Sequence, residues 1–292
     1  MSPSKIEWTN ETWNPTTGCT KVSPGCAHCY AESLTKRYAG APGWPAEFKP
    51  WTPANAAENV VLHPDRLDAP LRWKTPRMVF VDSMSDLFHE NIPDDYIDKI
   101  FAVMALTPPH TYQVLTKRPE RMREYMAGVP NARVAEAVMA FGAPYGVNWP
   151  LPNVWLGVTV ENQRWADERI PILLSTPAAV HFLSCEPLLG PISLVRIGGL
   201  QGPYDDWLRG EVREVIMGEE GVYARFKGLQ WVIVGGESGP KHRPFNPDWA
   251  RGIVEQCSNA EVACFVKQMG GARPGTKLED LPEDLRVREF PR

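Results

Sequence analysis

Short apolar segments alternate with helix-like segments along most of this chain, and this alternation limits its possible folds more than any other feature. The apolar segments are almost continuously hydrophobic, as expected of parallel strands that are covered on both faces. They comprise residues 78–82, 112–116, 154–159, 180–184, 231–235 and 263–267. The helix-like segments comprise residues 94–106, 119–128, 162–175 and 247–258, and three of them open with Pro or Asp, as helix starts prefer.

Six or seven βα units in succession predict an α/β fold, namely a partial or full parallel (β/α) barrel of the TIM-like type. No G-x-G-x-x-G motif follows the first strand, which argues against an open dinucleotide-binding sheet. We expect a further strand near residues 12–16 and a helix from Tyr30 to Tyr38. A chain of 292 residues can bury a large core, either as a single α/β domain or as two smaller ones. From the succession of βα units we predict that residues 1–292 form a single barrel domain.

Two segments interrupt the βα alternation. Residues 40–76 are rich in Pro and Trp, and residues 197–229 have the character of an insertion that forms a hairpin. We expect both excursions to cover the mouth of the barrel, where the strands end and where the chemistry of such folds takes place.

Charge and hydropathy narrow the location and the partners of the protein. The formal net charge is −4 and the sequence pI is about 5.9, so any contact with nucleic acid must depend on a local basic patch. The N-terminal segment lacks an apolar signal region, and no run approaches the roughly 18 apolar residues that a membrane span needs. We therefore expect a cytoplasmic protein without membrane contact.

Three of the six cysteines, Cys19, Cys26 and Cys29, lie close together in the segment GCTKVSPGCAHCYAE. In a reducing compartment such a cluster indicates metal binding or catalysis more than disulfide bonding. The C-x2-C pair lets two thiolates reach one metal centre from a single turn, and neighbouring Gly and Pro residues supply the bends of the loop. Cys257 and Cys264 are isolated, and we expect them to be small buried side chains.

Two kinds of metal site are compatible with three clustered thiols. The first is a [4Fe–4S] cluster whose fourth iron stays open for a ligand, since soft thiolates suit iron–sulfur clusters. The second is structural zinc with His28, His181 or Cys185 as the fourth ligand, although the chain has no second zinc knuckle. A thiol redox pair at Cys26 and Cys29 is a third alternative, but the thioredoxin-like context is missing.

Every predicted strand ends in polar residues. These residues are Asp82, Ser83 and Asp86; Thr116, Lys117 and Arg118; Thr159, Glu161 and Asn162; Ser184, Cys185 and Glu186; Gly235, Gly236, Glu237 and Ser238; and Lys267 and Gln268. The cysteine loop follows the first predicted strand and should open onto the same face. A mouth with this mixture of charges, amides and hydroxyls suits a zwitterionic, hydroxyl-bearing ligand.

Several motifs carry a resemblance to known proteins. WNPTTGC, SPGCAHCYAE, VGGESG and FVKQMGG together resemble an uncharacterised family of phage and bacterial proteins that share this three-cysteine motif and are regarded as radical-SAM-like. Three cysteines after the first strand of a βα barrel, followed directly by an aromatic residue (CAHCY), also resemble the radical S-adenosylmethionine (SAM) superfamily. Its usual spacing is C-x3-C-x2-C, whereas this chain has C-x6-C-x2-C, so the cluster loop must follow a different path. The resemblance spans nearly the whole chain and implies a barrel of the radical SAM type.

The resemblance also implies roles for particular residues. Cys19, Cys26 and Cys29 would ligate three irons of a [4Fe–4S] cluster and leave the fourth iron to the amino and carboxylate groups of SAM. Tyr30 would approach the adenine. Residues at the strand ends would complete the SAM site, with Ser83 and Asp86 toward the amino group, Lys117 or Arg118 toward the carboxylate, and Thr159, Glu161 and Asn162 toward the ribose.

An enzyme of this type cleaves SAM reductively, with an electron from an external donor, to a 5′-deoxyadenosyl radical that takes hydrogen from a substrate. Cys185 is a candidate hydrogen-atom donor or radical relay. The phage-type context favours a nucleic-acid substrate, either for modification or for photoproduct-type repair. Candidate contacts are the basic segments 117–123 and 241–243 and the stacking surfaces of Trp51, Trp73 and Trp207.

Two other functions remain compatible with the sequence. One is a zinc-stabilised, non-catalytic nucleic-acid-binding protein. The other is a barrel hydrolase that uses Glu161, Glu186 and Glu237 as acid and base, with the cysteines in a purely structural role.

Overall fold

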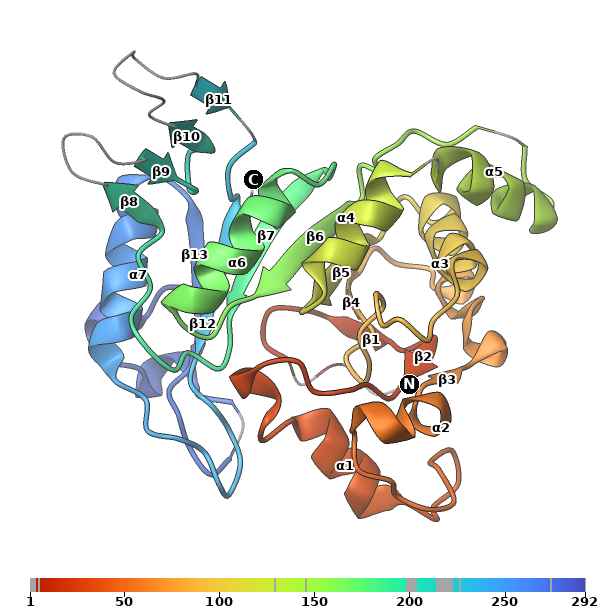
Figure 1. Cartoon of the computed structure of the whole chain (residues 1–292), viewed down its shortest axis with the longest axis horizontal. Helices are drawn as coiled ribbons and strands as arrows, with labels where there is room; N and C mark the ends of the chain where they lie inside the picture. The colour runs from red at the N-terminus through yellow and green to blue at the C-terminus, as the bar shows by residue number, and fades with distance from the viewer. Residues whose placement is uncertain are drawn as a thin grey trace. The chain divides into compact units, whose positions relative to one another are not determined.

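The structure of the chain is a computed structural model. It describes residues 4, 6–128, 130–144, 146–197, 204–213, 223–225, 227–273 and 275–291 (Figure 1). The chain divides into two compact units, the first comprising Met1–Leu156 with Pro177–Ala179 and the second Gly157–Thr176 with Val180–Arg292. The single barrel domain expected for residues 1–292 stays a prediction.

Within the described ranges, the main sheet has seven strands in the order β1-β4-β5-β6-β7-β12-β13. The pairs β1–β4, β4–β5, β7–β12 and β12–β13 are parallel. The strands are β1 (Glu11–Trp13), β4 (Met78–Val81), β5 (Thr111–Thr116), β6 (Val154–Thr159), β7 (Val180–Cys185), β12 (Trp231–Gly235) and β13 (Ala263–Gln268). All six apolar segments are therefore strands. The α/β class is confirmed, and the strand order, which follows the chain, is consistent with a partial barrel.

The first unit surrounds its strands with helices. These are α1 (Tyr30–Tyr38), α2 (Ala56–Asn59), α3 (Asp94–Leu106), α4 (Pro119–Ala127) and α5 (Pro130–Ala140). The strands bury β-branched side chains such as Val79 and Val81, and α3 buries Ile97 and Phe101. The limits predicted for α1 and α3 are confirmed to the residue. Helix α5, which packs on α3, was not predicted, although it opens with Pro in its first turn and is rich in Ala.

The excursion at residues 40–76 contains short elements only. Strand β3 (Val61–Leu62) pairs antiparallel with β2 (Thr16–Thr17). The excursion therefore lies against the two residues that come directly before the cysteine loop. That pairing brings a segment distant in the sequence against the start of the loop.

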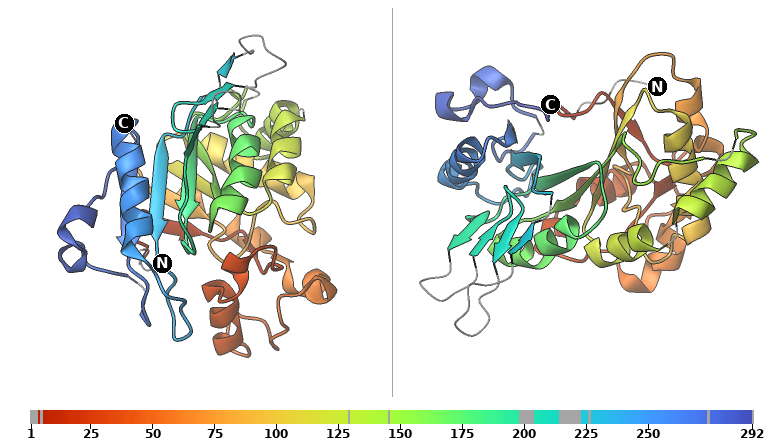
Figure 2. Two further views of the ribbon diagram at one scale, coloured as in Figure 1. Left: turned by 60° about the vertical axis from the view of Figure 1, so that its left-hand side comes forward. Right: turned by 90° about the horizontal axis from the view of Figure 1, so that it is seen from above.

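The second unit contains α6 (Gln163–Leu174) and α7 (Pro247–Asn259). Helix α7 lies beside β12 and β13 (Figure 2). It buries Ala250, Ile253 and Cys257, whose spacing places them on one face of the helix. Strand β12 is buried along its whole length, as its apolar sequence predicts.

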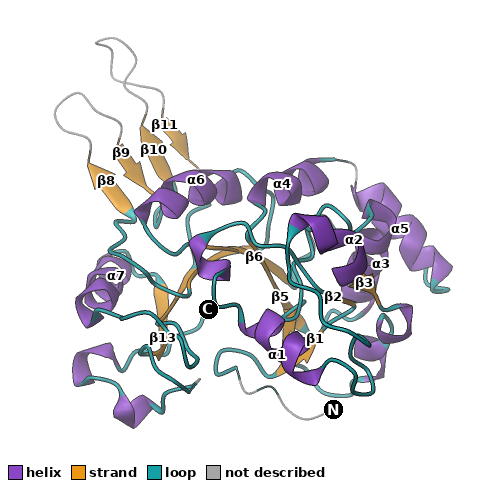
Figure 3. Ribbon diagram, turned by 60° about the horizontal axis from the view of Figure 1, so that its bottom comes forward, coloured by secondary structure: helices purple, strands orange, loops and turns teal. Residues whose placement is uncertain are grey.

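The predicted insertion of the second unit is a separate antiparallel sheet in the order β11-β10-β9-β8 (Figure 3). Its strands are β8 (Val195–Ile197), β9 (Tyr204–Asp206), β10 (Glu211–Arg213) and β11 (Tyr223–Arg225). The expected hairpin is present in the pairing of β9 with β10. Residues 198–203, 214–222 and 226 of the predicted insertion lie outside the described residues, and its position over a barrel mouth stays a prediction.

Among the helices of the described residues, none is long and apolar enough to cross a membrane.

Candidate functional site

The loop that carries the three clustered cysteines begins directly after β2. Gly18 starts it with a φ of +87°, a left-handed conformation that L side chains rarely adopt. A Cβ atom there would overlap the backbone carbonyl of Asn59, so the position requires glycine. Cys26 ends a 3-10 turn, and Cys29 lies directly before α1. Together with Cys19 they are free thiols of intermediate exposure.

Cys19 is in contact with the guanidinium of Arg118. Arg118 Nη1 lies 3.4 Å from Cys19 Sγ, and the thiol donates to the carbonyl oxygen of Thr20 at 3.4 Å. Burial and the charge of Asp86 raise the pKa of Cys19 to about 12, although Arg118 opposes the shift. The thiol therefore keeps its proton at neutral pH unless a metal ion displaces it.

Arg118 uses all three of its side-chain nitrogens inside the first unit. Nη1 also donates to Asp86 Oδ2 at 3.2 Å, and Nη2 donates to Thr20 Oγ1 at 2.7 Å and to Thr20 O at 3.3 Å. Nε donates to Glu90 Oε2 at 3.2 Å. The side chain is nearly buried, and this set of acceptors fixes the orientation of the planar guanidinium.

Asp86 binds Arg118 and is itself held by three further hydrogen bonds. Its Oδ1 accepts from Thr116 Oγ1 at 2.6 Å and from Phe88 N at 3.1 Å, and its Oδ2 accepts from Lys117 N at 3.0 Å and from Arg118. Burial alone would raise the pKa of this carboxyl, but the charge of Arg118 and these hydrogen bonds lower it. A contact between Asp86 and the SAM amino group would have to replace one of these four bonds.

His89 supports the same network from the other side of Thr20. Its Nδ1 accepts from Asn91 N at 3.1 Å, and its Nε2 lies 3.0 Å from Thr20 Oγ1. Burial and the charge of Arg118 lower the pKa of His89, so the ring is neutral near pH 7. Its proton is then on Nε2 and is donated to the Thr20 hydroxyl.

Asp82 fixes the chain just before the cysteine loop. It follows β4 with a φ of 56°, and its Oδ1 accepts from Thr16 N at 3.1 Å. Its buried Oδ2 has no hydrogen-bond partner among the residues that the structure describes. Burial raises the pKa of Asp82 to about 8, so the side chain is largely a neutral acid at pH 7.

Cys29 lies near a second cation, the side chain of Lys117. Burial raises the pKa of Cys29, while a backbone N–H of Glu32 and the charge of Lys117 lower it. The charge of Cys26 raises the pKa of both other cysteines, as expected of thiols close enough to repel one another once ionised. No described residue forms a hydrogen bond or ion pair with the Lys117 ammonium group.

Tyr30 and Ser83, both predicted to contact SAM, lie together beside the cysteine loop. The Tyr30 hydroxyl donates to the backbone carbonyl of Ser83, whose own hydroxyl donates to Asn14 Oδ1 at 3.1 Å. The Tyr30 side chain is 48% exposed, so one part of its ring stays accessible. The first unit thus holds the predicted site residues in two sets of contacts, one of Tyr30 with Ser83 and one of Cys19 and Asp86 with Arg118.

The remaining predicted residues belong to the second unit and have partners there. Arg169 Nη1 donates to Thr159 O at 2.7 Å and lies 3.4 Å from Glu161 Oε2. Asn162 caps α6 by accepting from Trp165 N at 3.3 Å.

Cys185 is fully buried at the end of β7. Burial, followed by the charges of Cys264, Glu186 and Glu161, raises its pKa well above the ordinary value.

The GGES segment owes its glycines to close packing. A Cβ on Gly235 would lie 2.5 Å from Glu186 Oε1, the same oxygen that forms a 3.0 Å ion pair with Lys267 Nζ. Glu237 is bound by Arg243, whose Nε donates to Oε2 at 2.9 Å. These observations give the segment a structural explanation.

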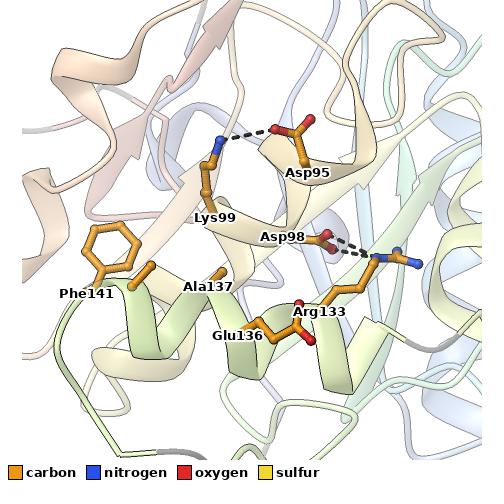
Figure 4. Close-up of a pocket in the computed structure, with 8 residues that line it drawn as sticks. Asp95, Asp98, Lys99, Arg133, Glu136, Ala137 and Phe141 are labelled. Atoms are coloured by element: carbon orange, nitrogen blue, oxygen red, sulfur yellow. Dashed lines mark hydrogen bonds and ion pairs between the residues drawn. The ribbon is translucent and has the colours of Figure 1, made fainter.

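A hollow of about 440 Å³ lies between α3 and α5 of the first unit (Figure 4). Four of its charged side chains form two pairs: Asp95 with Lys99 at 3.1 Å, and Asp98 with Arg133 at 3.0 Å. None of the residues predicted to form the site lines it. We therefore place the candidate site at the cysteine loop.

The donor set of the loop fits a thiolate-ligated cluster better than closed zinc coordination. Three thiols and two nearby cations suit a cluster, because thiolates are soft ligands and the cations offset their charge. Among the described residues no three His, Cys, Asp or Glu side chains are already arranged around a metal position, so binding would have to draw the sulfurs together. Both ring nitrogens of His181, a proposed zinc ligand, lie within 3.1 Å of backbone carbonyls.

Sequence reasoning missed the link between Arg118 and Cys19, and with it the roles of Thr20 and His89. The signal was the Lys-Arg pair directly after β5, which was expected to contact the SAM carboxylate or a nucleic acid and not a cysteine. The predicted stacking residues Trp51 and Trp207 are buried, so their rings are not free to stack on a base.

A family model described as "Protein of unknown function (DUF5131)" matches residues 3–284. The chain therefore belongs to this family. No curated protein and no solved structure matches it. The family carries no assigned reaction, so the function has to be argued from the site.

Proposed function

We propose that this protein is a radical SAM-type enzyme with a [4Fe–4S] cluster on Cys19, Cys26 and Cys29. The observation that carries the proposal is the grouping of three partly exposed thiols on one loop, next to Arg118 and Lys117. Three thiolates leave one iron of such a cluster without a protein ligand, which suits the binding of a substrate or cofactor.

The cluster would supply one electron from an external donor for the reductive cleavage of SAM. The chain itself would bind and orient the SAM molecule. The Lys117 ammonium, which has no hydrogen-bond or ion-pair partner among the described residues, would pair with the carboxylate, and the exposed part of the Tyr30 ring would pack on the adenine. Ser83, already tied to Tyr30, would fix the ring in place.

The proposed contacts of the second unit require more rearrangement. Thr159, Glu161 and Asn162 take part in the start of α6 and in the buried contacts of Arg169, and Cys185 is enclosed. A contact of Thr159, Glu161 and Asn162 with the ribose, and donation of a hydrogen atom by Cys185, would therefore require these existing contacts to change.

The carboxylate-dependent hydrolase finds less support. Its three candidate carboxylates, Glu161, Glu186 and Glu237, are each paired with a cation, namely Arg169, Lys267 and Arg243. A general acid or base needs a proton site that the substrate can reach, and these pairings occupy it.

We propose a nucleic acid as one substrate class for this enzyme, and the basic residues predicted to bind it can be compared with the structure. Arg121 from the basic segment 117–123 is bound to backbone carbonyls and to Asp94, and Arg243 is bound to Glu237. Trp73 remains partly exposed, and Lys241 is exposed. The basic side chains left for a phosphate backbone are therefore few.

The decisive experiment is anaerobic purification and cluster reconstitution, followed by metal and sulfide analysis and incubation with SAM and dithionite. We expect about four irons and four sulfides per chain and the formation of 5′-deoxyadenosine and methionine. Oligonucleotide substrates are added in parallel, and their products are analysed by mass spectrometry.

Other outcomes separate the rival functions. A colourless protein with one zinc would contradict the proposal and favour a zinc-stabilised binding protein. A cluster without SAM cleavage would reduce the protein to a cluster-binding protein.

A further inference from the structure

We propose that Arg118 is a positioning residue that tunes the reduction potential of the cluster through its hydrogen bond to the Cys19 sulfur. This inference rests on the proposed function of the cysteine loop. It assigns to Arg118 a role at the sulfur in place of a contact with the SAM carboxylate.

The first step is the geometry of the contact. Arg118 Nη1 lies 3.4 Å from Cys19 Sγ, and the same nitrogen lies 3.2 Å from Asp86 Oδ2. An N–H group is a donor, so it can stay on the sulfur after the thiol proton, now donated to Thr20 O, is replaced by iron. The contact is therefore compatible with ligation.

The second step is the rigidity of the arginine. Asp86, Thr20 and Glu90 accept hydrogen bonds from all three of its side-chain nitrogens, and only 9% of the residue is exposed. A substrate carboxylate would have to displace these acceptors. Within the part of the chain that the structure describes, the ammonium of the neighbouring Lys117 makes no such bonds, so we assign different roles to the two adjacent cations.

The third step is the direction of the effect. Reduction adds negative charge to a cluster, and hydrogen bonds to its sulfurs stabilise the more negative state and raise the potential. Asp86 acts in the opposite direction, because it contacts the same Arg118 nitrogen that touches the Cys19 sulfur, and its negative charge disfavours added negative charge there. Arg118 and Asp86 thus form a pair with opposed influences on the same cluster.

The test measures the midpoint potential of the reconstituted cluster in the full-length protein by spectroscopically monitored redox titration. The variants are R118M and D86N. R133M is the matched control, because Arg133 also pairs with a buried aspartate of the first unit, Asp98, and its own contacts involve no cysteine. Circular dichroism checks the fold of each variant, and the iron content is measured alongside.

We expect a more negative potential in R118M, a more positive one in D86N and an unchanged potential in R133M. A purely structural role of Arg118 would lower the iron content and leave the potential of the remaining clusters unchanged, which would overturn the inference. Potential shifts of the same sign in R118M and D86N would also overturn it, because a general loosening of the site would change the potential in the same direction in both variants. A wild-type protein that holds no iron–sulfur cluster would overturn the proposed function, and this inference with it.

Discussion

The six cysteines form two groups of three in very different surroundings. Cys19, Cys26 and Cys29 lie on one loop of the first unit with partial exposure, whereas the other three are buried in the second unit at the end of β7, in α7 and in β13. The loop thiols have cations and hydrogen-bond donors as neighbours. The buried thiols lie close to one another and to carboxylates, with no cation acting on Cys185 or Cys257 among the described residues.

The difference shows how position decides what a thiol can do. A hydrogen bond with Cys264, together with burial, raises the pKa of Cys257, so the Cys257 thiol stays protonated at neutral pH. At Cys19 the guanidinium of Arg118 opposes the effect of burial. The same residue type therefore serves as a core side chain in one unit and as a candidate ligand in the other.

The largest expected effect separates the two groups by metal content. Replacing Cys19, Cys26 or Cys29 by Ser should abolish iron binding, because two thiolates do not hold the cluster, while the free energy of unfolding of the apo-protein changes by less than about 1 kcal/mol. Iron analysis and urea denaturation measure the two effects. Full iron content in any of these variants would remove that cysteine from the site.

The polar scaffold beneath the loop should make the first unit sensitive to pH. In the folded protein the pKa of Asp82 is raised to about 8, so the unfolded chain loses this proton first as the pH rises. Asp82 therefore lowers stability progressively between about pH 4 and pH 8, with a limiting slope of about 1.4 kcal/mol per pH unit. D82N should remove that slope and stabilise the apo-protein near pH 7.5, because Asn keeps the acceptor for Thr16 N and tolerates a positive φ.

Urea denaturation across this pH range measures the slope, and D95N is the control. Asp95 is an exposed carboxylate on α3 that pairs only with Lys99 among the described residues. Equal slopes in D82N and the wild type would mean that Asp82 is ionised in the folded protein.

Replacing a cysteine of the buried group should change the stability of the protein and leave its iron content unchanged. Truncating Cys185 to Ala removes a fully buried sulfur and should cost about 1–2 kcal/mol, with unchanged iron content. Cleavage of SAM should persist. Loss of substrate turnover with intact SAM cleavage would favour the hydrogen-donor role, and loss of iron would make Cys185 a ligand.

The smallest expected effect concerns the second cation of the loop. K117Q removes the unpaired ammonium and should weaken SAM binding by about fivefold to tenfold, as expected for one partly exposed charge-assisted contact. Isothermal titration of SAM into the reconstituted protein measures this change. K241Q, which alters an exposed lysine of the second unit, should leave the affinity unchanged, and equal losses in both variants would contradict a specific role for Lys117.

The sequence predicted the regular elements of the fold well because they follow from local patterns. The apolar runs of β4 and β12 and the helix start at Asp94 are all found as expected. Helix α5 was missed because it stands outside the βα alternation that guided the prediction.

The site could be predicted only as far as its residue types. Cys19 and Arg118 are 99 residues apart in the chain, and their contact depends on how the end of β5 meets the loop after β2. Burial likewise depends on tertiary packing, so Trp51 and Trp207 were expected at the surface and are found in the interior. Spacing indicates a possible metal loop, whereas the groups that orient its sulfurs are determined by the fold.

The most direct test of the central claim is Mössbauer spectroscopy of protein reconstituted with iron enriched in its Mössbauer-active isotope, recorded with and without SAM. A [4Fe–4S] cluster on Cys19, Cys26 and Cys29 predicts that about a quarter of the iron signal, from the one iron without a cysteine ligand, changes when SAM is added. An iron signal that SAM leaves unchanged, or the absence of cluster iron, would contradict the account.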